Sequence, residues 1–316
     1  MRPAIICSHS SLHANEPLPG TAPRADVWML LEFDGVWGEK AFDESLLPVR
    51  VKNHLSETLR LIPNSKLLLI RQHMAHRQMA SESRLSSTRF FLALTHLEQP
   101  LLYDFTLNRY EDLLDMDIPG IAAQESTLRQ NLSSQVLLIV CTNGRRDWCC
   151  ARFGTDTYLE LIRASGAVSA QTTIWQSSHV GGHRFAPNIA CLPAGLFYGR
   201  VEKDELPILI ENCCKGHIYP AKARGRSRYP GPIQAAEIYL KMRSGTDNHE
   251  VYQVSQVVES QPDEWMVRFR SADTNLIHSV VIGRETSTQQ VFKSCNDTAA
   301  VPFTFYKLVD IQEVEE

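Results

Sequence analysis

Short apolar runs along the first part of the chain predict β-strands. They occupy residues 27–31, 66–70, 90–94 and 101–105, and proline, glycine or asparagine residues lie close to several of their ends. Between the first two runs, apolar residues recur at helical spacing at Leu47, Val51, Leu55, Leu59 and Ile62. A short helix is predicted over residues 110–116, ending at Pro119-Gly120. The expected order is β-α-β-β-β-α.

The next stretch of the chain repeats this order. Strands are predicted over residues 135–140, 171–176, 188–192 and 196–201. Helices are predicted over residues 157–164 and 204–214, with Gly166 and Gly216 as their ends. We therefore interpret residues 25–125 and 130–218 as two copies of one layout that share a pattern and little sequence identity.

The two ends of the chain differ from this layout. Residues 1–24 are rich in proline and glycine towards Pro23 and are predicted to be an irregular lead-in. Residues 219–316 are predicted to form a basic loop, a helix between Pro232 and Gly245, and a β-rich extension. In that extension, alternating apolar residues at 265–269 and 278–282 predict a hairpin around residues 271–275.

The composition is that of a folded globular protein. Of 316 residues, 43% are hydrophobic and 22% charged, which excludes a disordered chain, and the net charge of -4 argues against a general nucleic-acid binder. The longest apolar runs are shorter than the roughly 20 residues that a membrane helix needs, and the first residues turn polar too soon for a signal peptide. We therefore expect a cytoplasmic protein whose eight cysteines are thiols or metal ligands.

Candidate chemistry gathers in two loops of the second copy. Cys141 and Cys150 stand in C-x8-C spacing after its first strand, and His179 and His183 stand in H-x3-H spacing after its second. Loops that leave the carboxyl ends of neighbouring parallel strands share one edge of a sheet, so these side chains are expected to converge. Two thiolates and two imidazoles suit zinc or a [2Fe-2S] cluster. The wide cysteine spacing favours the larger cluster over a zinc knuckle.

Four segments of the sequence resemble the sucrase/ferredoxin-like family: residues 141–150, 179–188, 192–200 and 226–237. The resemblance implies an α/β fold of tandem thioredoxin-like repeats, here followed by a C-terminal helix and a β-rich extension. It also implies a [2Fe-2S] cluster with Cys141, Cys150, His179 and His183 as ligands. Cys149 lies beside Cys150, and the sequence alone permits either of them as the second cysteine ligand. The resemblance favours Cys150.

This ligand set predicts an electron carrier. A two-iron, two-sulfide core with two thiolates and two neutral imidazoles is electrically neutral when oxidised, so its potential is expected to exceed that of an all-cysteine cluster. Each imidazole also keeps one ring nitrogen that can exchange a proton, and we hypothesise that electron uptake is coupled to proton uptake at His179 or His183. We find no carboxylate pair that supports sucrose hydrolysis.

Two other classes of function stay open at this point. One is a thiol- or metal-dependent oxidoreductase that uses Cys149 or Cys150 as its nucleophile. The other is an interaction module that zinc stabilises.

An electron carrier needs a redox partner, here a reductase or another ferredoxin. A basic run is a candidate docking surface for it, with a solvated loop as the alternative; the run contains Lys215, Lys222, Arg224, Arg226 and Arg228. Neither nucleic acid nor a membrane is expected as a partner.

The remaining cysteines and histidines are given structural roles. Cys191, Cys213 and Cys214 are interpreted as core residues, because free cysteine packs like a small hydrophobic side chain. Cys7, His9 and His13 are interpreted as ordinary packing of the lead-in. The first copy has no cysteine after its first strand, so His73 and His76 are expected to bind no metal.

Overall fold

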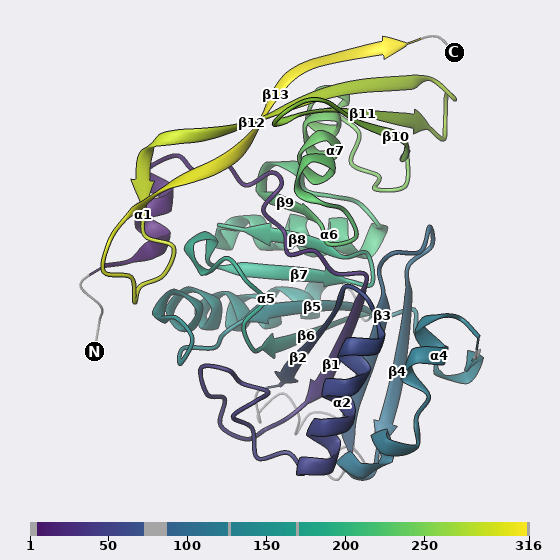
Figure 1. The fold of residues 1–316 in the computed structure, drawn as a ribbon. Helices are drawn as coiled ribbons and strands as arrows, with labels where there is room; N and C mark the ends of the chain where they lie inside the picture. Colours follow the sequence, from purple (N-terminus) through teal and green to yellow (C-terminus); the bar gives the residue numbers. More distant parts are fainter. Residues whose placement is uncertain (1–4, 73–86, 126–127, 169–170, 315–316) are drawn as a thin grey trace.

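The computed structural model describes residues 5–72, 87–125, 128–168 and 171–314. Its centre is a nine-stranded mixed sheet with the strand order β4-β3-β1-β2-β6-β5-β7-β8-β9 (Figure 1). The strands are β1 (Val27–Glu32), β2 (Ser65–Arg71), β3 (Thr88–Leu94), β4 (Leu101–Leu107), β5 (Val136–Cys141), β6 (Thr172–Ser177), β7 (Asn188–Leu192), β8 (Leu196–Gly199) and β9 (Ala223–Arg226).

The sheet consists of two copies of one strand arrangement. In the first copy, β1 pairs with β2 in parallel and with β3 antiparallel, and β3 pairs with β4. The second copy repeats these pairings with β5, β6, β7 and β8. The copies meet where β2 pairs antiparallel with β6, with Ile70 opposite Ser177. The tandem α/β layout predicted from the hydrophobic pattern is therefore confirmed, and the two copies form one continuous sheet.

Helices cover the faces of this sheet. They are α1 (Cys7–His13), α2 (Val49–Leu61), α4 (Ile118–Ala122), α5 (Thr155–Val168), α6 (Leu206–Lys215) and α7 (Gly231–Ser244). Single turns of 3-10 or π helix also occur: η2 (Tyr110–Asp115), η3 (Arg129–Asn131), η4 (Cys150–Gly154), η5 (His183–Phe185), η6 (Lys203–Glu205) and η7 (Pro220–Lys222).

Both faces of the central strands are buried, which explains their uninterrupted apolar runs. On one face of β1, Met29 packs with Leu55 of α2. On the opposite face, Trp28 belongs to a core that also contains Trp175 and Phe197 of the second copy. This shared core holds the two copies together, because its side chains come from both.

Two predicted helices differ in detail from the structure. The helix expected over residues 110–116 is a 3-10 helix, and a separate α4 spans Pro119-Gly120, because Asp117 accepts a hydrogen bond from the Gly120 N–H at its start. Helix α5 continues through Gly166 to Val168. A helical glycine costs only about 1 kcal/mol relative to alanine, so it need not end a helix that packs on the sheet.

Both chain ends also differ from the expected layout. The lead-in contains α1, and β9 from the expected extension joins the large sheet beside β8. After α7, a second, antiparallel sheet has the order β10-β11-β12-β13. Its strands are β10 (Tyr252–Gln261), β11 (Glu264–Ser271), β12 (Ile277–Val291) and β13 (Val301–Val314).

The hairpin predicted in the extension is confirmed. Strands β11 and β12 pair antiparallel with Val267 opposite Val280, and both side chains are buried. The longer β12–β13 hairpin extends across the molecule, and the loop at its end lies beside α1 (Figure 1). No α-helix within the described ranges has both the length and the apolar character that a membrane span requires.

A buried ion pair joins the large sheet to α7. Arg226 at the end of β9 donates two hydrogen bonds to Glu237 of α7, and their side chains are 5% and 0% exposed. Burial alone would raise the pKa of Glu237, but the Arg226 charge and hydrogen bonds lower it below its ordinary value of 4.5. The carboxylate is therefore charged in the folded protein and depends on Arg226 for compensation.

Replacing Glu237 by Gln should lower the free energy of unfolding by about 3–5 kcal/mol, because it leaves the Arg226 guanidinium buried without its counter-ion. Urea denaturation measures this loss. The exposed Lys307–Glu285 pair is the matched control, and Glu285→Gln should cost no more than about 1 kcal/mol.

The pH dependence of the same variant is a second readout. The folded pKa of Glu237 is lowered, so the stability it contributes is complete above its ordinary pKa and is lost as the pH falls through the folded pKa. Glu237→Gln should therefore lose less stability on acidification than the wild type. An equal acid dependence in both proteins would contradict the assigned ion pair.

Candidate metal centre

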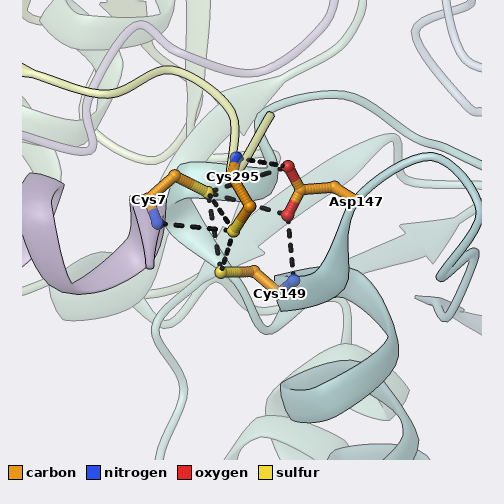
Figure 2. Close-up of side chains that lie close together, drawn as sticks. All are labelled: Cys7, Asp147, Cys149 and Cys295. Atoms are coloured by element: carbon orange, nitrogen blue, oxygen red, sulfur yellow. Dashed lines mark hydrogen bonds between the residues drawn. The ribbon is translucent and has the colours of Figure 1, made fainter. Parts of the chain in front are cut away.

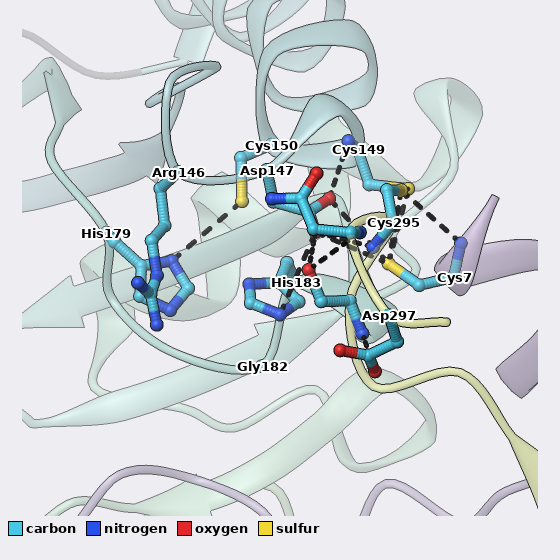
Figure 3. Close-up of polar contacts among 12 residues, drawn as sticks. Cys7, Arg146, Asp147, Cys149, Cys150, His179, Gly182, His183, Cys295 and Asp297 are labelled. Carbon is cyan, nitrogen blue, oxygen red and sulfur yellow. Dashed lines mark hydrogen bonds and ion pairs between the residues drawn. The ribbon is translucent and has the colours of Figure 1, made fainter. Parts of the chain in front are cut away.

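The parallel pairing of β5 with β6 positions the candidate ligands. Cys141, the last residue of β5, lies opposite Ser177, the last residue of β6, and His179 follows two residues later. The Sγ atoms of Cys141 and Cys150 lie 3.9 and 4.0 Å from the Nδ1 atom of His179. Figure 3 shows the Cys150–His179 contact. The two loops thus bring three of the four predicted side chains together, with their ligand atoms within 4.8 Å of one another.

His183, the fourth predicted side chain, packs beside His179. The centroids of the two rings are 4.9 Å apart, with an angle of 31° between the planes. The Nε2 atom of His183 lies 3.8 Å from Oδ2 of Asp147, whereas its Nδ1 atom is buried without a hydrogen-bond partner. The ring therefore carries a free ligand atom at the edge of the group formed by the other three residues.

Burial differs between the sulfur and the imidazole ligands. Cys141 and Cys150 are each 1% exposed, while His179 and His183 are half-buried. A hydrogen bond from Cys150, followed by one from His179, lowers the pKa of the Cys141 thiol well below its ordinary value. The same thiol pair and burial raise the pKa of Cys150. Burial also lowers the pKa of His183, which favours the neutral imidazole that binds metals.

Two glycines shape the loop that carries the histidines. Gly181 and Gly182 have backbone φ angles of +97° and +77°, which residues other than glycine rarely adopt. A Cβ atom at Gly182 would also lie 2.5 Å from Nη2 of Arg224. That guanidinium donates hydrogen bonds to the Gly181 carbonyl at 3.0 Å and to Oδ1 of Asn188 at 2.7 Å. The buried Arg224 side chain thus supports the histidine loop through its hydrogen bond to Gly181.

Comparison with known families decides the relationship of this chain. Residues 18–225, more than half of the sequence, match the sucrase/ferredoxin-like family. The chain belongs to this family. Among solved structures it is similar to a thioredoxin-like [2Fe-2S] ferredoxin from Aquifex aeolicus, with 16% identity over 31% of this chain and 96% of that chain and a TM-score of 0.28. A TM-score of this size supports no conclusion about the site. Comparison with curated proteins found no match.

In this sucrase/ferredoxin-like protein, the first copy packs a loop against the candidate metal centre. The amide of Asn143 donates to the carbonyl of Gly38 at 3.0 Å, and Arg146 forms an ion pair with Glu39 at 2.6 Å. The first copy therefore helps to hold the loop between Cys141 and Cys150. His73 and His76 of that copy lie outside the described residues.

The structure separates the adjacent cysteines of the C-x8-C loop. Cys150 forms one group with Cys141 and His179. Figure 3 shows that Cys150 faces His179, whereas Cys149 faces Cys7 and Cys295. Sequence reasoning did not anticipate this second group, which also contains Asp147, and it interpreted Cys7 as ordinary packing. The three cysteines lie 142 and 146 residues apart, so no local spacing connects them. The Cys149-Cys150 doublet was the one visible sign.

The other predicted roles divide between core and surface. Cys191 and Cys213 are buried in the core beside α6, as expected, and Cys214 packs against it. The basic run is not a continuous surface. Arg224 and Arg226 are buried and bonded within the protein, which removes them as docking charges; this part of the expectation is wrong.

Two substitutions in the histidine loop test its support. The Cβ atom introduced by Gly181→Ala would lie in open space, so this variant should lose about 1–3 kcal/mol of unfolding free energy from backbone strain alone. Gly182→Ala should cost more, because its Cβ also displaces the buried Arg224 guanidinium. Equal losses in chemical denaturation would show that Arg224 does not constrain the loop.

Proposed function

We propose that this protein is a [2Fe-2S] electron carrier whose cluster is held by Cys141, Cys150, His179 and His183. The observation that carries the proposal is the convergence of two buried sulfurs and the His179 imidazole from the loops after β5 and β6, with the His183 ring packed beside that of His179. Thiolates and imidazoles are the ligands of mixed iron–sulfur centres. Membership of the sucrase/ferredoxin-like family supports the same reading.

The residues present fit such a group. The buried Nδ1 atom of His183 has no hydrogen-bond partner, and an unsatisfied buried polar atom costs about 1–3 kcal/mol. As a ligand to a bound cluster, this atom would be satisfied. The lowered pKa of the Cys141 thiol favours the thiolate, which is the form of cysteine that binds metal.

The chain supplies the environment that such a cluster requires. When bound, a [2Fe-2S] cluster takes up and releases one electron. The side chains around Cys141 and Cys150, among them Trp175 and Val180, exclude water from the sulfurs. Two thiolates with two neutral imidazoles hold the oxidised site near electrical neutrality, which raises the potential relative to four thiolates.

His183 is also placed to hold a proton. With Nδ1 directed to the cluster, its Nε2 faces the carboxylate of Asp147, 3.8 Å away. A carboxylate beside a ligating imidazole orients the ring and raises its basicity. We propose that this nitrogen, or its counterpart on His179, loses its proton from the oxidised site at alkaline pH and takes it up again when the site is reduced.

We further propose that a reductase or another ferredoxin meets the protein at the imidazole edge. His179 and His183 are half-buried, whereas the cysteine ligands are buried, so electrons have their shortest route to the surface through the rings. Of the basic run, Lys215 is exposed and paired with Glu211. Arg145, in the loop of the cysteine ligands, adds an exposed positive charge on the cluster side.

A thiol-based enzyme fits less well. Cys149 is 0% and Cys150 1% exposed, so a substrate has no access to either sulfur. A nucleophilic cysteine needs an accessible thiolate. The other interpretation is that Cys141, Cys150, His179 and His183 bind zinc. The following experiment distinguishes zinc from a [2Fe-2S] cluster at these residues.

Cys141→Ser and Cys150→Ser should each abolish the visible absorption of anaerobically purified protein, because each removes an iron ligand. Cys149→Ser is the matched control and should keep that absorption, because its sulfur faces away from His179. Absorption spectra with iron and sulfide analysis measure the outcome. A colourless wild type that binds zinc through Cys141, Cys150, His179 and His183 would refute the proposal.

His183→Cys should keep a cluster and lower its midpoint potential, because a third thiolate adds negative charge. Protein-film voltammetry of this variant and the wild type measures the shift. An unchanged potential in a variant that retains its iron would exclude His183 as a ligand.

Proton coupling predicts that the midpoint potential falls as the pH rises, by up to about 59 mV per pH unit. The sign follows because protons taken up on reduction become scarcer at high pH. A redox titration between acid and alkaline pH measures the slope. A flat line would rule out proton uptake at either histidine.

A further inference from the structure

A second group of metal-ligating side chains lies beside the proposed cluster, and none of its members is a proposed cluster ligand. It contains Cys7 of α1, Cys149 and Asp147 of the loop after β5, and Cys295 of the loop between β12 and β13 (Figure 2). The three Sγ atoms are mutually 3.5, 3.3 and 3.6 Å apart. An Asp147 carboxylate oxygen lies 3.7 Å from Sγ of Cys7.

We propose that this group is a structural zinc site with Cys7, Cys149, Cys295 and Asp147 as its four ligands. A tetrahedral ion with Zn–S bonds of about 2.3 Å places its sulfurs about 3.8 Å apart. The observed separations are slightly shorter, so small side-chain movements admit the ion. Four protein ligands also close the coordination sphere, which is the mark of a structural rather than a catalytic zinc site.

The sulfur geometry argues against other uses of the three thiols. A disulfide has an S–S bond of about 2.05 Å, and a disulfide between any two of these sulfurs would leave the third buried beside it. In a two-iron cluster, ligands on different irons are held apart by the bridging sulfides. Here all three sulfurs are mutual neighbours, which suits one ion. The hard carboxylate oxygen favours Zn²⁺ over Cu(I).

The four side chains of this group are buried from solvent. Cys7, Cys149 and Asp147 are at most 1% exposed and Cys295 is 8% exposed, beneath the apolar side chains of Ile6, Trp148, Phe153 and Phe292. The backbone N–H of Cys7 donates to Sγ of Cys295 at 3.5 Å, and Oγ of Ser8 lies 3.3 Å from Sγ of Cys149. Donors of this kind stabilise sulfur that carries negative charge.

Three hydrogen bonds fix the position of the Asp147 carboxylate. Its oxygens accept from the backbone N–H groups of Cys149 and Cys295, both at 2.9 Å, and from the Ser294 hydroxyl at 2.9 Å. A buried carboxylate needs such compensation. On binding, Zn²⁺ forms three Zn–S bonds and one Zn–O bond, and each protonated thiol releases its proton to solvent.

The position of the ligands assigns the site a role. Cys7 and Cys295 lie outside the family match at residues 18–225, at the two ends of the chain, and Cys149 is next to a proposed cluster ligand. One ion would therefore fasten α1 and the β12–β13 loop onto the cluster loop. The ligands converge from distant parts of the chain, so the bond energy of the metal contributes directly to folding.

Elemental analysis of the purified full-length protein tests the proposal. We expect about one zinc ion per chain in addition to iron. Cys295→Ser should lose the zinc and keep the iron and its absorption, whereas Cys141→Ser should lose the iron and keep the zinc. Cys214→Ser, a thiol outside both groups, is the control and should keep both metals. The two proposals thus fail independently.

Two measurements on the wild type keep the test decisive if Cys295→Ser does not fold. Cobalt supplied in place of zinc should give the intense bands of a tetrahedral thiolate site. All eight cysteines should titrate as free thiols after denaturation with a chelator. A disulfide among Cys7, Cys149 and Cys295, a wild type that neither contains nor takes up zinc or cobalt, or a folded Cys295→Ser variant that retains zinc would overturn the proposal.

Discussion

The parallel pairing of β5 with β6 is the constraint on which the candidate metal centre depends. It aligns the last residues of the two strands, Cys141 and Ser177, so the two following loops start from one edge of the sheet. The antiparallel partner β7 fixes β5 on its other side. A shift of this register by one residue would turn the Cys141 side chain to the face covered by α5 and α6, away from His179.

The first copy matters to the centre although the candidate ligands come from the second. It extends the sheet through β2 and β6, contributes Trp28 to the shared core, and places Gly38 and Glu39 against the cysteine loop. Each of these contacts limits the motion of a ligand-bearing segment. The tandem arrangement therefore stabilises the site from the side that carries no cysteine ligand.

Asp147 connects the two groups of ligands. One carboxylate faces the cysteine group of the chain ends and also lies near Nε2 of His183. Its charge therefore acts on both sites, and the order of the N- and C-terminal segments affects the ring that holds the proposed cluster. This arrangement relates the packing of the chain ends to the electrostatics of the proposed cluster site, because a single buried charge contacts both groups.

The sequence by itself determined strands β1–β8, most helices, the tandem layout and three converging side chains, because apolar periodicity and ligand spacing are local properties of the chain. The sequence could not decide between Cys149 and Cys150, since neighbouring residues of one loop can face different partners. It also gave no sign that Cys7 and Cys295 lie together, and it misjudged the exposure of Arg224 and Arg226. Their roles arise from contacts between distant segments, which only the tertiary structure brings together: burial turns the arginines into internal ion-pair and hydrogen-bond donors, and the β12–β13 hairpin carries Cys295 to α1.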